Sequence, residues 1–367
     1  MLAERIERKI FKDIAPKGIH YIKPVHYRDA QGLVATVYDQ LLREFQLVPP
    51  ITIHAAVPEL LAGVWSMTRE SMVAGDVSRA EREAIPAAVS HINQCPFCVD
   101  VHSTMLHGGS EHGVAAAILS GNVDQLPDSR IGNIARWALA TRSPGAEILR
   151  TPPFSPEEAP ELIGTAVAFH YINRMVNVFL DESPFALLPI GLRWTKGFIP
   201  RVAGKVIAKR ILGVSVTPGE SLDLLPDAEL PPEFSWAESN PAVAGAFARL
   251  SAVIEQAGAD VLSDEVRDLV RQHVESWNGD DPGMSRRWVE DAVAGLREPD
   301  QAAARLTLLT ALASYQVDEK VIHEFRQHYP SDAQLIAATA WASFTAARKV
   351  SSWLHPVLER EEQLATA

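Results

Sequence analysis

Apolar residues recur at three- and four-residue steps along nearly the whole of this 367-residue chain. This is the period of one face of an α-helix, and few runs show the two-residue alternation of strands. Clusters of Pro and Gly separate the helical segments, at Pro49-Pro50, Gly108-Gly109, Pro152-Pro153, Pro184 and Pro231-Pro232. We therefore expect an all-α protein.

An internal repeat narrows the architecture further. The segment 156–180 aligns without gaps with the segment 330–354, and upstream of each lies a similar helix start, at Ser78 and Ser263. The aligned segments share Pro156/Pro330, Thr165/Thr339, Ala166/Ala340, Ala168/Ala342, Arg174/Arg348, Val176/Val350 and Leu180/Leu354. We interpret the chain as a duplication with three parts: a domain over 1–182, a connecting arm over 183–230 and a degenerate repeat over 231–367.

The connecting arm has a distinct composition. Its stretch 183–219 contains no Asp or Glu but several cations: Arg193, Lys196, Arg201, Lys205, Lys209 and Arg210. We interpret it as a segment that packs across the two domains. A patch for an anionic substrate or a membrane surface is the alternative.

The overall charge excludes some classes of function. There are 34 basic and 46 acidic residues, a net charge of -12, which argues against a general nucleic-acid binder. No stretch is apolar enough for a membrane span, and the charged start lacks the apolar region of a secretory signal. We expect a cytoplasmic protein, in which a lone pair of cysteines is more often catalytic or metal-binding than structural.

All cysteine chemistry must occur at one place, because the only two cysteines are Cys95 and Cys98. Pro96 follows Cys95, and proline is favoured at the first helical position, so we expect Cys95 to cap a helix that ends near Gly108-Gly109. Thiols at such helix starts often have a lowered pKa. This dipole argument alone favours Cys95 as the more acidic thiol.

Two further residues stand at helical spacing around the thiols. His102 lies four residues after Cys98, on the same helix face. Glu83 lies on the preceding helix, and a turn at Asn93-Gln94 would bring it back towards His102. A carboxylate, an imidazole and a thiol in this order form a proton relay. The second repeat lacks this set, since Asp268, Asp280, Gly283 and Arg287 stand opposite Glu83, Cys95, Cys98 and His102.

The pattern Glu-x11-Cys-x2-Cys-x3-His resembles the signature of the alkylhydroperoxidase D-like proteins, within the carboxymuconolactone decarboxylase superfamily; here it is Glu83, Cys95, Cys98 and His102. The resemblance covers about residues 55–180 and implies an all-helical fold, helix-packed homo-oligomers and thiol-dependent peroxidase or disulfide-reductase chemistry. It also implies that Cys98 attacks the peroxide and that Cys95 resolves the sulfenic acid. Known peroxidases of this family carry a second histidine where this chain has Phe97, and His91 or His107 are the candidates to replace it.

Other interpretations of these residues remain open. A zinc site from Cys95, Cys98, His102 and His107 is disfavoured, because His107 is far round the helix from His102. A redox sensor or scaffold would use the same thiols without turnover, and lactone decarboxylation would use only His102 and Glu83. We expect no cofactor and no metal, a hydroperoxide or disulfide substrate, and a dithiol reductant that the sequence does not identify. A group of four polar and aromatic residues further along the chain either binds substrate or holds packed helices together. They are His170, Tyr171, Asn173 and Arg174.

Overall fold

The computed structural model describes residues 15–183 and 216–354 of the chain. Most of the connecting arm, including its cations, therefore lies outside the described residues. Within the described residues no strand forms, apart from an isolated bridge between Ile19 and Leu180. The prediction of an all-α fold is confirmed.

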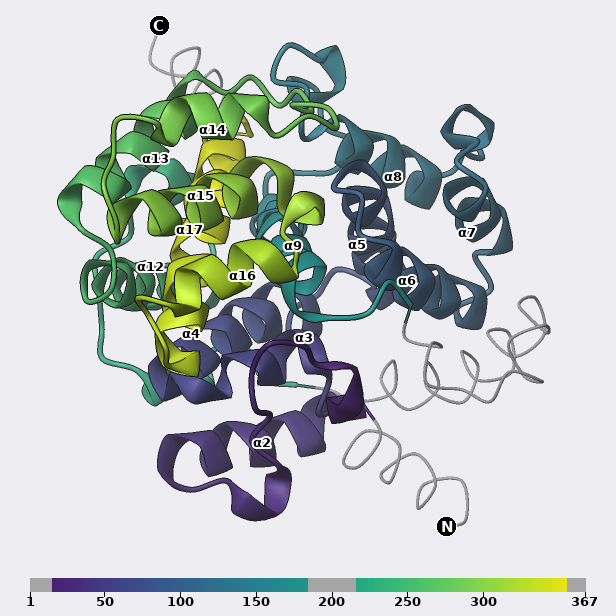
Figure 1. Ribbon diagram of the computed structural model, residues 1–367. Helices are drawn as coiled ribbons and strands as arrows, with labels where there is room; N and C mark the ends of the chain where they lie inside the picture. Colours follow the sequence, from purple (N-terminus) through teal and green to yellow (C-terminus); the bar gives the residue numbers. More distant parts are fainter. Residues whose placement is uncertain (1–14, 184–215, 355–367) are drawn as a thin grey trace, which may run out of the picture.

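Within residues 15–183 the first half forms eight α-helices. They are α2 (Gly32–Glu44), α3 (Pro49–Thr52), α4 (Pro58–Thr68), α5 (Arg79–Ile92), α6 (Pro96–Gly108), α7 (His112–Leu119), α8 (Arg130–Ala140) and α9 (Ala159–Phe179). Figure 1 shows α5, α6, α7 and α8 together on one side of the molecule.

The second half lies against the other side of α9 (Figure 1). It contains α12 (Pro241–Ala259), α13 (Asp264–Ser276), α14 (Arg287–Val293), α15 (Asp300–Ala313), α16 (Glu319–Arg326) and α17 (Asp332–Trp353). No helix in the described ranges is long and apolar enough to cross a membrane.

The two aligned segments of the repeat form the two long central helices. In the register that pairs Leu180 with Leu354, the last residues of α9 and α17 coincide, and their first residues differ by one position. The two helices pack against each other, and α4 packs against α12. Nearly every residue of α9 is buried, and its polar side chains are hydrogen-bonded within the protein.

In the upstream register, which pairs Ser78 with Ser263, the second half differs from the first at one place that matters for the site. Opposite the first turns of α6 the chain forms a loop over residues 277–286, and α14 begins only at Arg287. The Cys-bearing helix start therefore has no helical counterpart in the second half.

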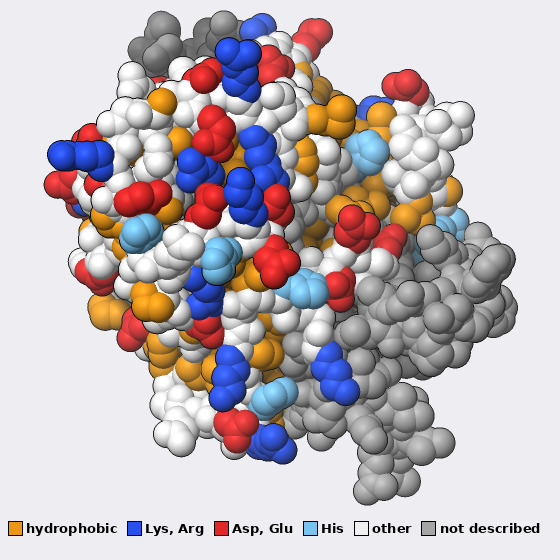
Figure 2. Space-filling view, viewed as in Figure 1, with side chains coloured by type: hydrophobic (Ala, Val, Ile, Leu, Met, Phe, Trp, Pro, Cys, Tyr) orange, Lys and Arg blue, Asp and Glu red, His pale blue; other side chains and the backbone are white. Residues whose placement is uncertain are grey.

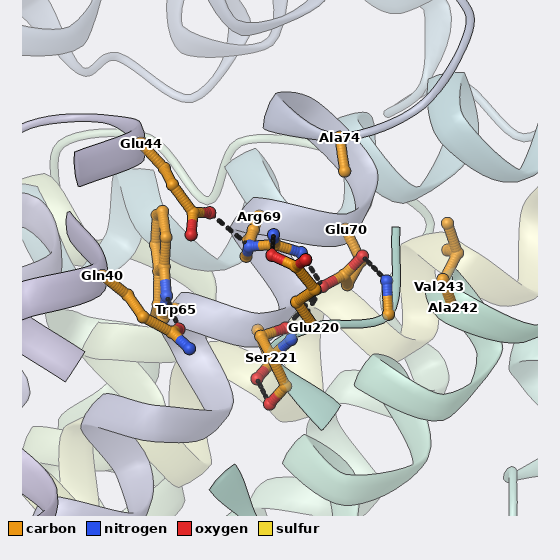
Figure 3. A network of polar contacts seen from close by, with 12 residues as sticks. Gln40, Glu44, Trp65, Arg69, Glu70, Ala74, Glu220, Ser221, Ala242 and Val243 are labelled. Atoms are coloured by element: carbon orange, nitrogen blue, oxygen red, sulfur yellow. Dashed lines mark hydrogen bonds and ion pairs between the residues drawn. The ribbon is translucent and has the colours of Figure 1, made fainter. Parts of the chain in front are cut away.

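A buried ionic network ties the described part of the connecting arm to the first half (Figure 3). Arg69 is fully buried and donates to Glu44 at 2.5 Å, Glu70 at 2.6 Å and Glu220 at 3.2 Å. Glu70 also accepts the Ser221 hydroxyl at 2.5 Å. A buried guanidinium is stable only when carboxylates face it, so this network fixes residues 219–221 against α2 and the π-helical turn Arg69–Val73.

Surface charges of both signs alternate on the face formed by α13 to α16 (Figure 2). Several are paired, as in Arg305 with Glu290 at 2.9 Å and Arg286 with Asp318 at 2.9 Å. The positive charges on this face are thus distributed among acids rather than gathered into one basic patch.

Candidate active site

The two helices that carry the predicted site residues form a hairpin through a tight turn. Ser78 caps α5 with a capping box that includes Glu81, and α5 ends at Ile92. Cys95 is the residue before α6, Pro96 is its first residue, and α6 ends at Gly108. Gln94 has a φ of 51°, a left-handed conformation that reverses the chain. The predicted helix limits are confirmed.

The turn brings Glu83 to His102. The Nδ1 atom of His102 lies 2.7 Å from Oε2 of Glu83, and both side chains are buried. Glu83 accepts a hydrogen bond from Nδ1–H of His102, so in the neutral imidazole Nε2 is the nitrogen that can act as a base. The His102 ring stands edge-on to Phe169 of α9, with 4.7 Å between the ring centroids.

A third charge faces this pair, from a residue that the sequence analysis missed. Arg79 Nε donates to Oε1 of Glu83 at 2.9 Å. Burial would raise the pKa of Glu83, but the Arg79 guanidinium and the His102 imidazole outweigh it and lower the pKa of this carboxyl. The signal was present in the sequence, because Arg79 precedes Glu83 by one helical turn.

The two thiols are free, buried and adjacent. Cys95 is 0% exposed and Cys98 is 2% exposed. Burial first, and the neighbouring Cys98 sulfur second, raise the pKa of Cys95 well above its ordinary value. The expected lowering of the Cys95 pKa by the helix start is therefore wrong, because this helix start is buried rather than open to water.

Polar side chains of α9 form hydrogen bonds with residues next to the two thiols. The Asn173 side chain reaches the Cys95 thiol and donates to Ser90 Oγ at 2.9 Å. Asn93 donates to Oδ1 of Asn173 at 3.0 Å and lies 3.1 Å from Nδ1 of His170. The sequence left His170, Tyr171, Asn173 and Arg174 open between substrate binding and helix packing. Of these four, Asn173 contacts the site.

The other three serve packing. His170 is fully buried and also lies 2.8 Å from the Thr141 hydroxyl. The Tyr171 hydroxyl lies 2.7 Å from Nε2 of His54, and Arg174 Nε donates to the Ala311 carbonyl of the second half at 2.8 Å.

A cavity of about 710 Å³ reaches the turn on the Cys95 side. Its wall includes Cys95, Phe97 and His91 from the first half and Tyr315 from the second. Cys98 is not among its lining residues, which also include apolar side chains of α7 and α9 and the acids Asp100, Asp181 and Glu182. Figure 2 shows hydrophobic side chains gathered between the α5–α7 side and the α14–α16 side.

Comparison with known proteins places this arrangement in a family. Residues 58–121, which include Glu83, Cys95, Cys98 and His102, match the carboxymuconolactone decarboxylase family. An alkyl hydroperoxide reductase of Mycobacterium tuberculosis is 38% identical over 344 residues, which cover 94% of this chain and 97% of that protein. The chain belongs to the alkylhydroperoxidase D-like branch of the carboxymuconolactone decarboxylase superfamily. The likeness to that relative extends through the second half.

Within this alkylhydroperoxidase D-like fold, the two candidates for the missing histidine lie in different places. His91 lines the cavity beside Cys95. His107 is buried, and its Nδ1 atom lies 3.0 Å from Nδ1 of His112 at the start of α7. Of the two, only His91 shares the cavity with a cysteine.

In this alkylhydroperoxidase D-like site, the histidines proposed as zinc ligands are engaged with other side chains. His102 uses Nδ1 for Glu83, and His107 faces His112. Across residues 15–183 and 216–354, no group of three or more His, Cys, Asp and Glu side chains is arranged to hold a metal ion.

Proposed function

We propose that this protein is a thiol-dependent peroxidase that reduces organic hydroperoxides with the Cys95–Cys98 pair. The observation that carries the proposal is the buried Glu83–His102 contact of 2.7 Å on the helix that holds Cys98. A general base is useful only if its tautomer is fixed, and the ionised Glu83 fixes it. The relationship to an alkyl hydroperoxide reductase supports the same activity.

In the first step Cys98 is the nucleophile. His102 lies one turn further along α6, about 6 Å along the axis, so its side chain leaves the same face of the helix as that of Cys98. His102 takes the thiol proton, the thiolate attacks the terminal peroxide oxygen, and the O–O bond breaks. Cys98 becomes a sulfenic acid, and the alkoxide leaves as an alcohol after taking a proton from His102.

In the second step Cys95 resolves the sulfenic acid. Its raised pKa keeps it a thiol until Cys98 has reacted, and the adjacent sulfurs then form a disulfide with loss of water. A dithiol reductant returns both sulfurs to thiols by exchange. We assign its attack to Cys95, because the cavity borders that sulfur.

Turnover with an external dithiol tests the proposal. The reduced protein is mixed with cumene hydroperoxide and excess dithiothreitol, and peroxide loss is followed for the wild type, Cys98→Ser and Cys95→Ser. The wild type is expected to consume many equivalents and Cys98→Ser none. Unchanged consumption by Cys98→Ser sinks the mechanism, while one equivalent consumed without turnover by the wild type indicates a redox sensor instead.

The proposal also covers the cellular compartment and the oligomeric state of the protein. We place the protein in the cytoplasm, where thiols are kept reduced, and expect homo-oligomers built by helix packing. Size-exclusion chromatography with light scattering measures the second expectation.

A further inference from the structure

The second half, although it has no thiol, holds the turn that leads into Cys95. Gln94 donates its side-chain amide to the Asp281 carboxylate, which also accepts the Tyr315 hydroxyl. Tyr315 is a wall residue of the cavity beside Cys95. Burial and the hydrogen bond to Asp281 raise the pKa of Tyr315 to about 12, so its hydroxyl stays a donor at neutral pH.

A second connection runs through Arg142, which follows α8. Its Nη1 atom donates to the Ile92 carbonyl at 2.6 Å, and its Nε atom donates to the Gly279 carbonyl at 3.0 Å. Gly279 has a φ of 95°, and a Cβ there would lie 1.8 Å from the Arg142 carbonyl oxygen. Only glycine fits this close approach, so the loop over 277–286 is fitted to the first half.

A third connection starts on α9. Asn177 donates to the Asn93 carbonyl at 3.2 Å and to the Ser314 hydroxyl at 3.0 Å. Each of the three residues before Cys95 is therefore linked, directly or through one side chain, to the second half. The left-handed Gln94 needs such support, because a non-glycine residue in this conformation persists only where its surroundings fix it.

The placement of this loop follows from the degenerate repeat. In the register that pairs Ser78 with Ser263, residues 280–283 stand opposite Cys95 to Cys98. Where the first half has the start of α6, the second half has a loop, and this loop reaches across to the turn before Cys95.

We propose that Asp281 and Tyr315 are positioning residues that hold the 92–94 turn so that the Cys95 sulfur stays in line with Cys98 for disulfide closure. Closure joins two groups of one chain, and its rate depends steeply on how well they are aligned. A displacement of about 1 Å can slow such a step by roughly a hundredfold. The inference rests on the proposed dithiol chemistry of Cys95 and Cys98.

Its test measures closure without any peroxide, so that it can fail separately from the peroxidase proposal. The reduced protein reacts with dithiodipyridine. One thiolate first forms a mixed disulfide and releases one thiopyridone; the second cysteine then displaces the other thiopyridone and forms the Cys95–Cys98 disulfide. Two protein thiols are oxidised and one reagent disulfide is reduced. The rate constant of the second phase of thiopyridone absorbance is the rate of disulfide closure.

Asp281→Ala is compared with Asp280→Ala, a neighbouring exposed carboxylate whose side chain contacts Asn278 rather than the turn. We expect the second phase of Asp281→Ala to be roughly tenfold slower and that of Asp280→Ala to match the wild type. Tyr315→Phe keeps the ring in the cavity but loses the hydroxyl, and should slow closure in the same direction by less.

Equal second-phase rates in Asp281→Ala and Asp280→Ala overturn the inference. Circular dichroism checks that each variant is folded. If Asp281→Ala does not fold, Tyr315→Phe decides alone: a closure rate equal to that of the wild type overturns the inference, and a slower one supports it.

Discussion

At the scale of single residues, the charge on Glu83 is what the site depends on most. Arg79 and His102 lower its pKa although it is buried. Glu83 therefore stabilises the fold at pH values above its ordinary pKa, and this contribution is lost as the pH falls through the lowered value.

In Arg79→Gln burial dominates and the pKa of Glu83 rises. The acid limb of the pH profile for thiol alkylation should then move to higher pH, and Arg79→Lys should restore it. An unmoved limb in Arg79→Gln would contradict this account.

The residues differ in how far sequence predicted them. Glu83 and His102 could be predicted to meet, because helix spacing and one short turn decide their positions. Asn173 could not be placed at Cys95, since that contact depends on how α9 crosses the hairpin. The acidity of Cys95 was predicted in the wrong direction, because burial is a property of the packed molecule.

At the scale of elements, helix ends follow local chemistry and helix packing does not. Pro96 and Gly109 limited α6 as predicted, whereas the contact of the 277–286 loop with the turn before Cys95 was visible only in the structure. The Arg69 network likewise joins α2, a π-helical turn and residues 219–221, which no sequence pattern connects.

Removing Arg69 tests how much this network stabilises the fold. Arg69→Met leaves Glu44 and Glu70 without their buried cation, and should lower the free energy of unfolding by about 3–5 kcal/mol. Arg43→Met is the control: Arg43 lies 3.9 Å from Glu44 with a side chain 63% exposed, so its loss should change stability by less than about 0.5 kcal/mol. Urea unfolding measures both, and equal effects would show that the buried network is not stabilising.

At the scale of the whole molecule, the two halves share one hydrophobic core, and both contribute residues to the wall of the cavity beside Cys95. Buried side chains of α9 and α17 belong to a single hydrophobic cluster, and Tyr315 of the second half lines the cavity at Cys95. The sequence predicted a second half without the thiol site, and only the structure showed its contacts with the turn before Cys95. The three-part division of the chain and the oligomeric state stay predictions.

The central claim is that Cys98 is the residue that peroxide oxidises. The most direct measurement uses Cys95→Ser, in which the sulfenic acid cannot be resolved within the chain. The reduced variant receives one equivalent of cumene hydroperoxide and then dimedone, and mass spectrometry of its peptides locates the adduct. We predict an adduct on Cys98 in nearly every molecule, and far slower labelling when His102→Gln is added. A Cys95→Ser protein that leaves the peroxide intact, with Cys98 unlabelled, would contradict the account.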